Sequence, residues 1–451
     1  MEHIEKLAPL GLFDARVPRY TSYPTAPVFS KEVDDTAQSV WIGALDPAVP
    51  VSVYVHIPFC ERLCWFCACR TQGTSTLHPV LSYLNTVETE LRKLAATLPK
   101  GIRMGRLHWG GGTPTILPPQ MIHQLAQAIK AVIPPAEVFE FSVEIDPTMV
   151  DAAKIDALAA EGMNRASIGI QDFSPDVQAA IGRAQPFEDT AACVAMLRKA
   201  GINSLNADLV YGLPHQTLAK ITDTVSKVLT LDPDRIALFG YAHVPHMAKR
   251  QKLIDEAVLP DDHARYALAE SAAAQFNAAG FQTIGIDHFA KPDDSMAIAA
   301  GDGSLRRNFQ GYTADTCPTL IGIGASSISR FAQGYVQNAS ATAAYIQRIE
   351  AGKLAGFRGH AMTEIDQLRS RAIEMLMCTF AIDLVELRET FGADEATLIP
   401  LHEAVAAKFA GYVTLSKDAL TVTPQGRPLL RMIAQFYDAY ADTGAVYSKA
   451  S

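Results

Sequence analysis

Residues 51–73 read VSVYVHIPFCERLCWFCACRTQG. The first seven residues are rich in Val and Ile, which is typical of a buried strand, and Pro58 ends that strand. Cys60, Cys64 and Cys67 follow directly, with the spacing C-x3-C-x2-C. Three thiolates this close together can surround one face of a metal cluster only if their backbone forms a loop. The stretch therefore predicts a strand that leads into a metal-binding loop.

Five further segments repeat this order of an apolar strand, then Gly, Pro or polar residues, then a helix-like stretch. They are RLHWGGGTP (106–114), EFSVEIDP (140–147), RASIGIQDF (165–173), SLNADLVYGLP (204–214) and RIALFGYAHVP (235–245). Units that recur roughly every 30 to 55 residues are typical of strand–helix repeats in a parallel sheet. We therefore expect an α/β fold with a partial (β/α)6-type, TIM-like barrel, whose functional loops follow the strands at one end. A doubly wound open sheet is the alternative, because spacing alone does not give the strand order.

The sequence changes character at both ends of this region. We expect an irregular arm rich in Tyr and Pro over residues 1–49, and a barrel with extra strands over residues 50–345. Residues 346–451 are expected to form a mainly helical, winged-helix-like domain, in which Thr363 caps a helix and residues 411–436 form a strand, a turn, a strand and a helix. Because this domain is neither notably basic nor rich in aromatic residues, a packing or lid role is favoured over DNA binding.

Composition narrows the class of protein. The 451 residues carry a formal net charge of −9, which argues against bulk attraction to nucleic acid or acidic lipid. The N-terminus lacks the pattern of a signal peptide, and no apolar stretch is long enough to span a membrane, so we expect a cytoplasmic protein. Outside the cysteine-rich stretch, Cys193, Cys317 and Cys378 are expected to be small buried apolar residues.

Thiolates are soft ligands that suit iron–sulfur clusters and zinc. Three cysteines leave one iron of a [4Fe–4S] cluster free, whereas an electron-transfer cluster normally has four cysteine ligands. The free iron can chelate the amino and carboxylate groups of S-adenosylmethionine. A structural zinc site is the alternative, but such sites usually use two well-separated C-x2-C pairs. Cys69 is interpreted as a fourth ligand in a resting form, a nearby unligated thiol or local packing, with no catalytic role.

The loop is also the signature of a known superfamily. On C-x3-C-x2-C at the end of the first strand, the chain is identified as a member of the radical S-adenosylmethionine superfamily. The ordered motifs PRYTSYPT, YVHIPFC, HWGGGTPT, VEIDP, GIQDF, DLVYGLP, DHFA and RNFQGYT extend the resemblance to the oxygen-independent coproporphyrinogen III oxidases, also called coproporphyrinogen dehydrogenases. The resemblance covers essentially the whole chain.

The resemblance implies a reaction of haem biosynthesis. In it, a 5′-deoxyadenosyl radical removes a hydrogen atom from the β-carbon of a propionate group of coproporphyrinogen III. Loss of CO2 and one electron leaves a vinyl group, and two such events give protoporphyrinogen IX. The expected partners are this substrate and a flavodoxin- or ferredoxin-like reductant, with no nucleic acid, and the protein is expected to be a monomer.

The resemblance also implies two molecules of S-adenosylmethionine, one on the cluster and one beside it. The positions matched to the first molecule are Tyr54, Gly111, Glu144 and Ile328. The positions matched to the second are Phe66, Gly112, Thr113, Gln171, Arg183, Asp208 and Ala242. From the residues alone, Glu144 can hold ribose hydroxyls or be a surface acid at a strand end. Arg183 can bind a ligand carboxylate or form a surface salt bridge.

The substrate carries four carboxylates, and arginine matches carboxylate geometry best. Arg19, Arg306 and Arg307 are therefore the candidates for substrate contact, with His288 as a weaker one. Tyr20 is expected either to stack on the macrocycle or to pin the arm to the barrel. Three alternatives remain at this point: a radical-SAM-like haem chaperone, a nucleic-acid-modifying radical enzyme and a structural zinc protein.

Overall fold

The computed structural model describes residues 2–441 and 447–449. Contacts group the chain into two compact units. The barrel unit comprises Ser30–Pro260 and Cys317–Ala361, and the helical unit comprises Met1–Phe29, Asp261–Thr316 and Met362–Ser451. The expected boundaries at 49/50 and 345/346 divide the chain differently. The predicted boundaries divide the sequence into three consecutive segments, whereas the two units each combine separate segments. The two divisions describe different things, so the predicted boundaries stay a prediction.

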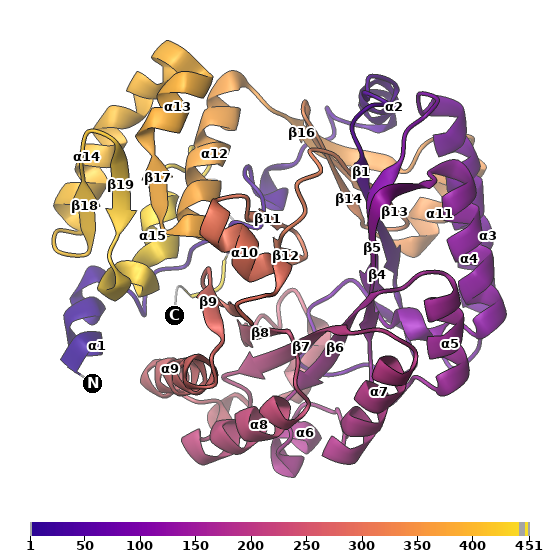
Figure 1. Cartoon of the computed structure of the whole chain (residues 1–451), viewed down its shortest axis with the longest axis horizontal. Coiled ribbons are helices and arrows are strands. Elements are labelled where there is room, and N and C mark those ends of the chain that lie inside the picture. Colours follow the sequence, from indigo (N-terminus) through magenta and orange to yellow (C-terminus); the bar gives the residue numbers. More distant parts are fainter. Residues whose placement is uncertain (1, 442–446, 450–451) are drawn as a thin grey trace. The chain divides into compact units, whose positions relative to one another are not determined.

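Six parallel strands form the centre of the barrel unit (Figure 1), and each of them coincides with one of the six predicted apolar segments. They are β1 (Val51–Ile57), β4 (Met104–Gly111), β5 (Pro135–Ile145), β6 (Arg165–Gln171), β7 (Ser204–Tyr211) and β8 (Arg235–Gly240). Their spatial order is their chain order, β1-β4-β5-β6-β7-β8. This order is that of a barrel and rules out the doubly wound alternative, in which the strand order reverses.

On its other side, β1 pairs with β13, also in parallel. Three antiparallel strands then extend the sheet beyond β13. The parallel strand on this side is β13 (Leu320–Ile323). The three antiparallel strands are β14 (Ile328–Phe331), β15 (Gly334–Asn338) and β16 (Gly356–Ala361). The sheet of the barrel unit is therefore mixed, with its parallel part carrying the loops that follow each strand.

Burial alternates along β6 and β7 with a period of two, so this part of the sheet has two different faces. In β6, Ala166, Ile168 and Ile170 are buried, whereas Ser167 and Gly169 between them are only partly buried. β7 shows the same alternation. The apolar face packs on helices, and the polar face is left for the interior of the barrel.

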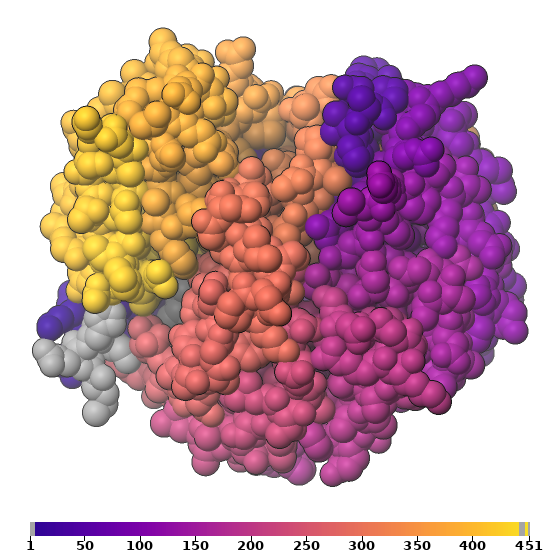
Figure 2. Space-filling model, in the orientation of Figure 1, coloured from indigo at the N-terminus to yellow at the C-terminus, as the bar shows by residue number. Residues whose placement is uncertain are grey.

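The helices of the barrel unit lie between successive strands, and Figure 1 shows α3, α4, α5 and α7 along the outer side of β1, β4 and β5. The helices are α2 (Asp35–Gly43), α3 (His78–Thr97), α4 (Pro119–Val132), α5 (Ala152–Ala160), α6 (Pro175–Ala180), α7 (Phe187–Lys199), α8 (Leu218–Thr230) and α11 (Thr342–Glu350). Figure 2 shows the atoms from β1 to α8, coloured purple to pink, as a closely packed surface on the face in view.

The helical unit has its own apolar core, to which residues of the N-terminal arm and of the C-terminal region both contribute. Its helices are α1 (Glu2–Leu7), α9 (Asp262–Ala278), α10 (Ser295–Asp302), α12 (Glu364–Thr379), α13 (Leu384–Phe391), α14 (Ile399–Lys408) and α15 (Leu430–Gln435). Its strands form hairpins β9 (Gln282–Ile284) with β10 (His288–Ala290) and β11 (Arg306–Asn308) with β12 (Gly311–Thr313), and a small sheet of β17 (Ala381–Asp383), β19 (Ala419–Val422) and β18 (Val413–Leu415).

The predictions for the C-terminal region and the prediction for the N-terminal arm have different outcomes. Thr363 caps α12 in a capping box with Asp366, and β18 and β19 precede α15, so both predictions for the C-terminal region are confirmed. The expectation of an irregular arm is wrong in part, because α1 and α2 lie within residues 1–49. The cause for α2 is Asp34, whose side chain accepts hydrogen bonds from the N–H groups of Thr36 and Ala37.

No helix in the described part of the chain is long and apolar enough to cross a lipid bilayer.

Candidate functional site

The cysteine loop leaves the sheet at the end of β1 and is closed by a short parallel pairing of Phe59–Cys60 with Gln72–Gly73. Cys60 and Cys64 are buried, Cys67 is half-buried and Cys69 is exposed. No disulfide joins any of the seven cysteines, all of which lie in the described part of the chain. The prediction of a strand running directly into a loop of three neighbouring thiols is confirmed.

The three predicted ligands have different electrostatic surroundings. Burial raises the pKa of the Cys60 thiol to about 11, and a hydrogen bond from Thr113 opposes this effect only in part. At Cys67, a hydrogen bond from the Cys69 thiol, a second one from the Cys69 N–H at 3.4 Å, and the positive charges of Arg250 and Arg183 lower the pKa despite burial. Cys67 is therefore the thiol most readily held as the thiolate that a metal requires.

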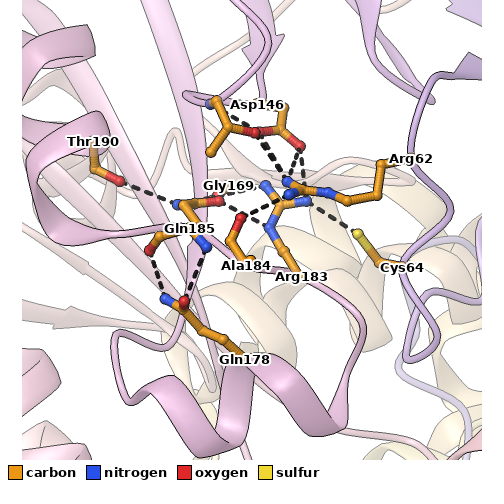
Figure 3. Close-up of polar contacts among 10 residues, drawn as sticks. Arg62, Cys64, Asp146, Gly169, Gln178, Arg183, Ala184, Gln185 and Thr190 are labelled. Atoms are coloured by element: carbon orange, nitrogen blue, oxygen red, sulfur yellow. Dashed lines mark hydrogen bonds and ion pairs between the residues drawn. The ribbon is translucent and has the colours of Figure 1, made fainter.

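Arg183 lies against the loop and is 8 % exposed (Figure 3). Its Nη1 is 3.3 Å from Cys64 Sγ and 3.1 Å from Asp146 Oδ2. Its Nη2 donates to the carbonyl of Gly169 at 2.8 Å, and its Nε to Gln185 Oε1 at 3.0 Å. The ion pair considered for Arg183 is thus present but buried, and a contact with a ligand carboxylate stays a prediction.

Three of the predicted positions on the polar face of the sheet form one network at the end of β4. The rings of Tyr54 and His108 stack with their centroids 5.8 Å apart, and His108 Nε2 is 3.4 Å from Glu144 Oε1. Glu144 Oε2 accepts the N–H of Gly111 at 3.0 Å. Burial alone would raise the pKa of Glu144, but the hydrogen bond and charge of His108 and the Gly111 N–H hold the pKa below its usual value. Glu144 is therefore a half-buried carboxylate, ready to accept hydroxyl donors.

His56, which the sequence analysis did not single out, fixes the orientation of Tyr54. Its Nε2 is 3.0 Å from the carbonyl oxygen of Arg70, and its Nδ1 is 3.0 Å from the Tyr54 hydroxyl. Because a carbonyl can only accept, Nε2 carries the proton, and Tyr54 donates its hydroxyl proton to Nδ1. The pKa of His56 is lowered by burial, which keeps the ring neutral.

Gly111 and Gly112 have no room for a side chain. A Cβ on Gly112 would lie 2.5 Å from the carbonyl oxygen of Phe59, and Gly111 has φ +109° with the His56 ring 2.5 Å from its Cβ position. The next residue, Thr113, is buried and its N–H donates to the carbonyl of Phe59 at 2.8 Å. These residues thus pack the end of β4 closely against the short strand Phe59–Cys60, at the start of the cysteine loop.

Gln171 is the last residue of β6, and Asp208 lies within the adjacent strand β7. Gln171 has a positive φ of 71°, which turns the chain at the strand end. Asp208 accepts hydrogen bonds from Ser167 Oγ at 2.8 Å and from Asn206 Nδ2 at 2.7 Å. Asp208 therefore has partners within the protein, and binding of a ligand by Asp208 stays a prediction.

Phe66 and Ala242 are joined by Gln251, another residue that the sequence analysis missed. The fully buried Gln251 donates through Nε2 to the carbonyl of Phe66 at 2.8 Å and to that of Ala242 at 3.1 Å. The Phe66 side chain also packs on an apolar cluster that includes Ile181 and is therefore partly engaged in general packing. Gln251 holds the cysteine loop next to the end of β8.

Ile328 is partly buried at the start of β14, where its backbone passes close to Gly322 of β13. All eleven positions matched to S-adenosylmethionine thus belong to the barrel unit. Its strands β1 and β4 to β8 bring most of these positions to their C-terminal ends, as the fold predicts.

The five candidates for substrate contact all belong to the helical unit. Three of them gather around the buried Asp287: His288 Nδ1 is 2.6 Å from its Oδ1, Arg307 Nη2 is 3.8 Å from its Oδ2, and the charge of Arg19 acts on it. Burial opposes ionisation, but Arg307, His288 and Arg19 lower the pKa of Asp287 strongly. The helical unit therefore contains a cationic group with Asp287 as its shared anion.

The other two candidates point elsewhere. Arg306 precedes Arg307 in a strand, so it faces the opposite side, and it donates to the carbonyls of Gly303 and Leu305. Tyr20 is buried and donates its hydroxyl to Asp438 Oδ2 at 3.0 Å. This contact pins the arm to the C-terminal region and not, as expected, to the barrel.

The residues around the loop fit a [4Fe–4S] cluster with one open iron. Three soft thiols lie in one loop, a buried guanidinium faces one of them, and glycines keep the adjacent strand end free of side chains. Among the residues that the structure describes, no three His, Cys, Asp or Glu side chains converge tightly enough for a single metal ion. In a [4Fe–4S] cluster each cysteine thiolate binds a different iron, so the three thiolates lie farther apart than three ligands of one metal ion.

Comparisons with known proteins identify the family of the chain. The Radical SAM superfamily matches residues 54–228, and the HemN C-terminal domain matches residues 362–429. An oxygen-independent coproporphyrinogen III oxidase of Cereibacter sphaeroides (strain ATCC 17025 / ATH 2.4.3) is 64% identical over 452 residues, covering 100% of both chains. The protein of that name from Escherichia coli (strain K12) is 37% identical over 438 residues, covering 96% of this chain and 95% of its relative.

The solved structure of coproporphyrinogen III oxidase (HemN) from Escherichia coli, described as a radical SAM enzyme, superposes with a TM-score of 0.90. It is 36% identical and covers 94% of this chain and 100% of that chain. The fold and the cysteine loop thus define the class, a radical S-adenosylmethionine protein. Within that class, the chain belongs to the family of oxygen-independent coproporphyrinogen III oxidases.

Proposed function

We propose that this protein is an oxidoreductase of haem biosynthesis. It converts two propionate groups of coproporphyrinogen III into vinyl groups without O2 and so forms protoporphyrinogen IX. The observation that carries the proposal is the loop after β1, in which Cys60, Cys64 and Cys67 lie together as free thiols. This loop belongs to a chain that matches oxygen-independent coproporphyrinogen III oxidases over its full length.

The [4Fe–4S] cluster and S-adenosylmethionine, when bound, supply the 5′-deoxyadenosyl radical that removes a hydrogen atom from the substrate. Cys60, Cys64 and Cys67 hold the cluster and leave one iron for the sulfonium compound. Glu144 accepts the ribose hydroxyls, which its low pKa supports because the group remains ionised at neutral pH. Tyr54, Gly111 and Ile328 complete the contacts to this first molecule.

A second S-adenosylmethionine lies beside the first in this proposal. Its contacts are Phe66, Gly112, Thr113, Gln171, Arg183, Asp208 and Ala242. Their placement around the cysteine loop supports the assignment, since Gln251 ties Phe66 to Ala242 and Arg183 reaches Cys64.

The substrate carboxylates bind to cationic side chains of the helical unit. Arg19, His288 and Arg307 are supported by their grouping around Asp287. Arg306 and Tyr20 complete the proposed set. Guanidinium groups suit this role because they bind a carboxylate through two parallel hydrogen bonds.

We further propose a monomer that works in the cytoplasm and takes its electron from a flavodoxin- or ferredoxin-like protein. The free thiols support this location, because cysteines stay reduced in that compartment. The net charge of −9 gives no support to a nucleic-acid substrate.

The test is turnover by protein reconstituted anaerobically with iron and sulfide. Given S-adenosylmethionine, a reductant, coproporphyrinogen III and an acceptor for the electron that each decarboxylation releases, the wild-type protein should form protoporphyrinogen IX with release of CO2, as measured by mass spectrometry. Cys64→Ala should abolish the product, whereas Cys193→Ala, which changes a buried cysteine of α7, should keep it. Binding of haem without any conversion of the porphyrinogen would instead identify a haem chaperone and overturn the proposal.

A further inference from the structure

Arg183 and Asp146 form a buried ion pair that touches a predicted cluster ligand. Their side chains are 9% and 7% exposed, and their atoms Nη1 and Oδ2 are 3.1 Å apart. The same Nη1 lies 3.3 Å from Cys64 Sγ, so one nitrogen serves both the carboxylate and the sulfur (Figure 3). Because Nη1 carries two N–H groups, it can face the carboxylate and the sulfur at the same time.

The pair is held in place from both sides. On the arginine side, Gln185 and the carbonyl of Gly169 accept the remaining donors of Arg183, as Figure 3 shows. Gln185 is itself fixed by hydrogen bonds with Gln178 and Thr190. The guanidinium therefore has little freedom to leave Cys64.

On the aspartate side, the anchor is Arg62, which lies inside the cysteine loop between Cys60 and Cys64. Its Nη2 is 3.1 Å from Asp146 Oδ2, and its Nη1 donates to the carbonyl of Ala184 at 2.7 Å. Thr148 adds hydrogen bonds from its N–H and its hydroxyl to Asp146 Oδ1. Asp146 thus joins the cysteine loop to the end of β5 and to the segment that carries Arg183.

The electrostatic consequence depends on where each charge lies. A hydrogen bond to a cluster sulfur, or a positive charge beside it, stabilises the more negative reduced cluster and raises its reduction potential. Arg183 contributes both effects at Cys64. Asp146 opposes them, because it adds a negative charge nearby, 3.1 Å from the same Nη1.

We propose that Arg183 and Asp146 set the reduction potential of the cluster through Cys64, with Arg183 raising the potential and Asp146 limiting that increase. Arg62 is a positioning residue that keeps Asp146 against the loop. The inference rests on the cluster assigned in the proposed function but not on the identity of the substrate.

Two substitutions that break the same ion pair separate this role from a purely structural one. Arg183→Met removes the positive charge and the donor, so the potential should fall. Asp146→Asn removes the negative charge and keeps the hydrogen bond from Arg183 to Cys64, so the potential should rise. If the pair only supported the loop, both variants should act in the same direction.

The measurement is the midpoint potential of the reconstituted full chain without S-adenosylmethionine, followed by electron paramagnetic resonance during a redox titration. At a fixed potential, each variant should change the ratio of reduced to oxidised cluster about tenfold, which is about 59 mV for a one-electron couple. Arg198→Met is the matched control, because it removes the same charge from an arginine of α7 whose partners lie outside the cysteine loop: the carbonyls of Asn203 and Asp232 and the carboxylate of Asp234. Its potential should equal that of the wild type.

Shifts of the same sign in the two variants, or no shift in Arg183→Met, would overturn the inference. Should Arg183→Met bind less iron than the wild type, Arg183→Gln replaces it and must also lower the potential. A wild-type protein that binds no iron–sulfur cluster would contradict the proposed function itself, which distinguishes the two failures.

Discussion

Glu90 is a buried acid in the middle of α3. It is 4% exposed and accepts hydrogen bonds from Tyr345, from the N–H of Gly324 and from Asn338, at 2.7 to 3.0 Å. Burial nevertheless outweighs these bonds and raises the pKa of Glu90 from 4.5 to about 7. The folded protein therefore keeps a proton on Glu90 at pH values where the unfolded chain has lost it.

This raised pKa gives stability a definite pH dependence. Since the folded state binds the extra proton, the contribution of Glu90 is fully present below pH 4.5 and is lost as the pH rises to about 7. The loss is about 3 kcal/mol in free energy of unfolding. Glu90→Gln should remove this slope in urea unfolding measured on both sides of the window. Glu88→Gln, on the same helix but reaching solvent, should keep the slope, and equal slopes in all three proteins would contradict the assignment.

A second prediction at this scale concerns the glycine pressed against the cysteine-bearing strand. In Gly112→Ala, the new Cβ would collide with backbone oxygens of Phe59 and Ile57, which cannot rotate away. We expect a loss of about 1–3 kcal/mol in stability and reduced iron content after reconstitution. Gly301→Ala is the control, because nothing lies within 4 Å of its Cβ position, and its iron content should be that of the wild type.

At the residue scale, the sequence predicted the metal ligands better than it predicted the residues that contact them. Cys60, Cys64 and Cys67 could be found because ligand spacing is local. Asp146 and Gln251 could not, because each acts across strand ends that are close only after folding. Arg183 was found, but its burial against Cys64 depends on residues more than a hundred positions away in the chain.

At the scale of elements, the six parallel strands were predictable because each is an apolar run ended by Gly or Pro. The helices of the arm were not. Helix α1 has six residues, too few to be stable alone, and its last residue, Leu7, is fully buried in the core of the helical unit. Tertiary packing, which the local pattern does not contain, therefore decides that α1 forms.

The cap of α12 provides the test at this scale. Thr363 accepts the N–H of Asp366, and the Asp366 carboxylate accepts the N–H of Thr363. Thr363→Ala should therefore lower the free energy of unfolding by about 1 kcal/mol, as measured by chemical denaturation. Thr363→Ser keeps the hydroxyl and should recover most of the loss. If Ser and Ala were equally unstable, the cap would not be the cause.

At the scale of the whole molecule, the helical unit is assembled from three separate stretches of chain. Leu12 and Val17 of the arm share one core with Leu376 and Ile433. Arg431 reinforces this connection by donating to the carbonyl of Pro18 at 3.0 Å. No local pattern predicts such a core, which is why the sequence indicated an arm and a C-terminal domain as separate regions.

Leu12→Ala tests this shared core. The cavity should cost about 2–5 kcal/mol, and amide hydrogen exchange should accelerate in α12 and α15, hundreds of residues away in sequence. Exchange in β1 and β4, which have the separate core of the barrel unit, should be unchanged. Val40→Ala, at a position that is 64% exposed, is the control and should change neither region.

The three-stretch construction also affects how the protein emerges from the ribosome. The arm is translated first, but the segments that cover Leu7 and Leu12 are translated last, after the entire barrel unit. At typical rates of about 5–20 residues per second, these apolar side chains wait roughly 20 to 90 seconds for their partners. During that interval the nascent arm is a natural client for chaperones that shield hydrophobic peptides.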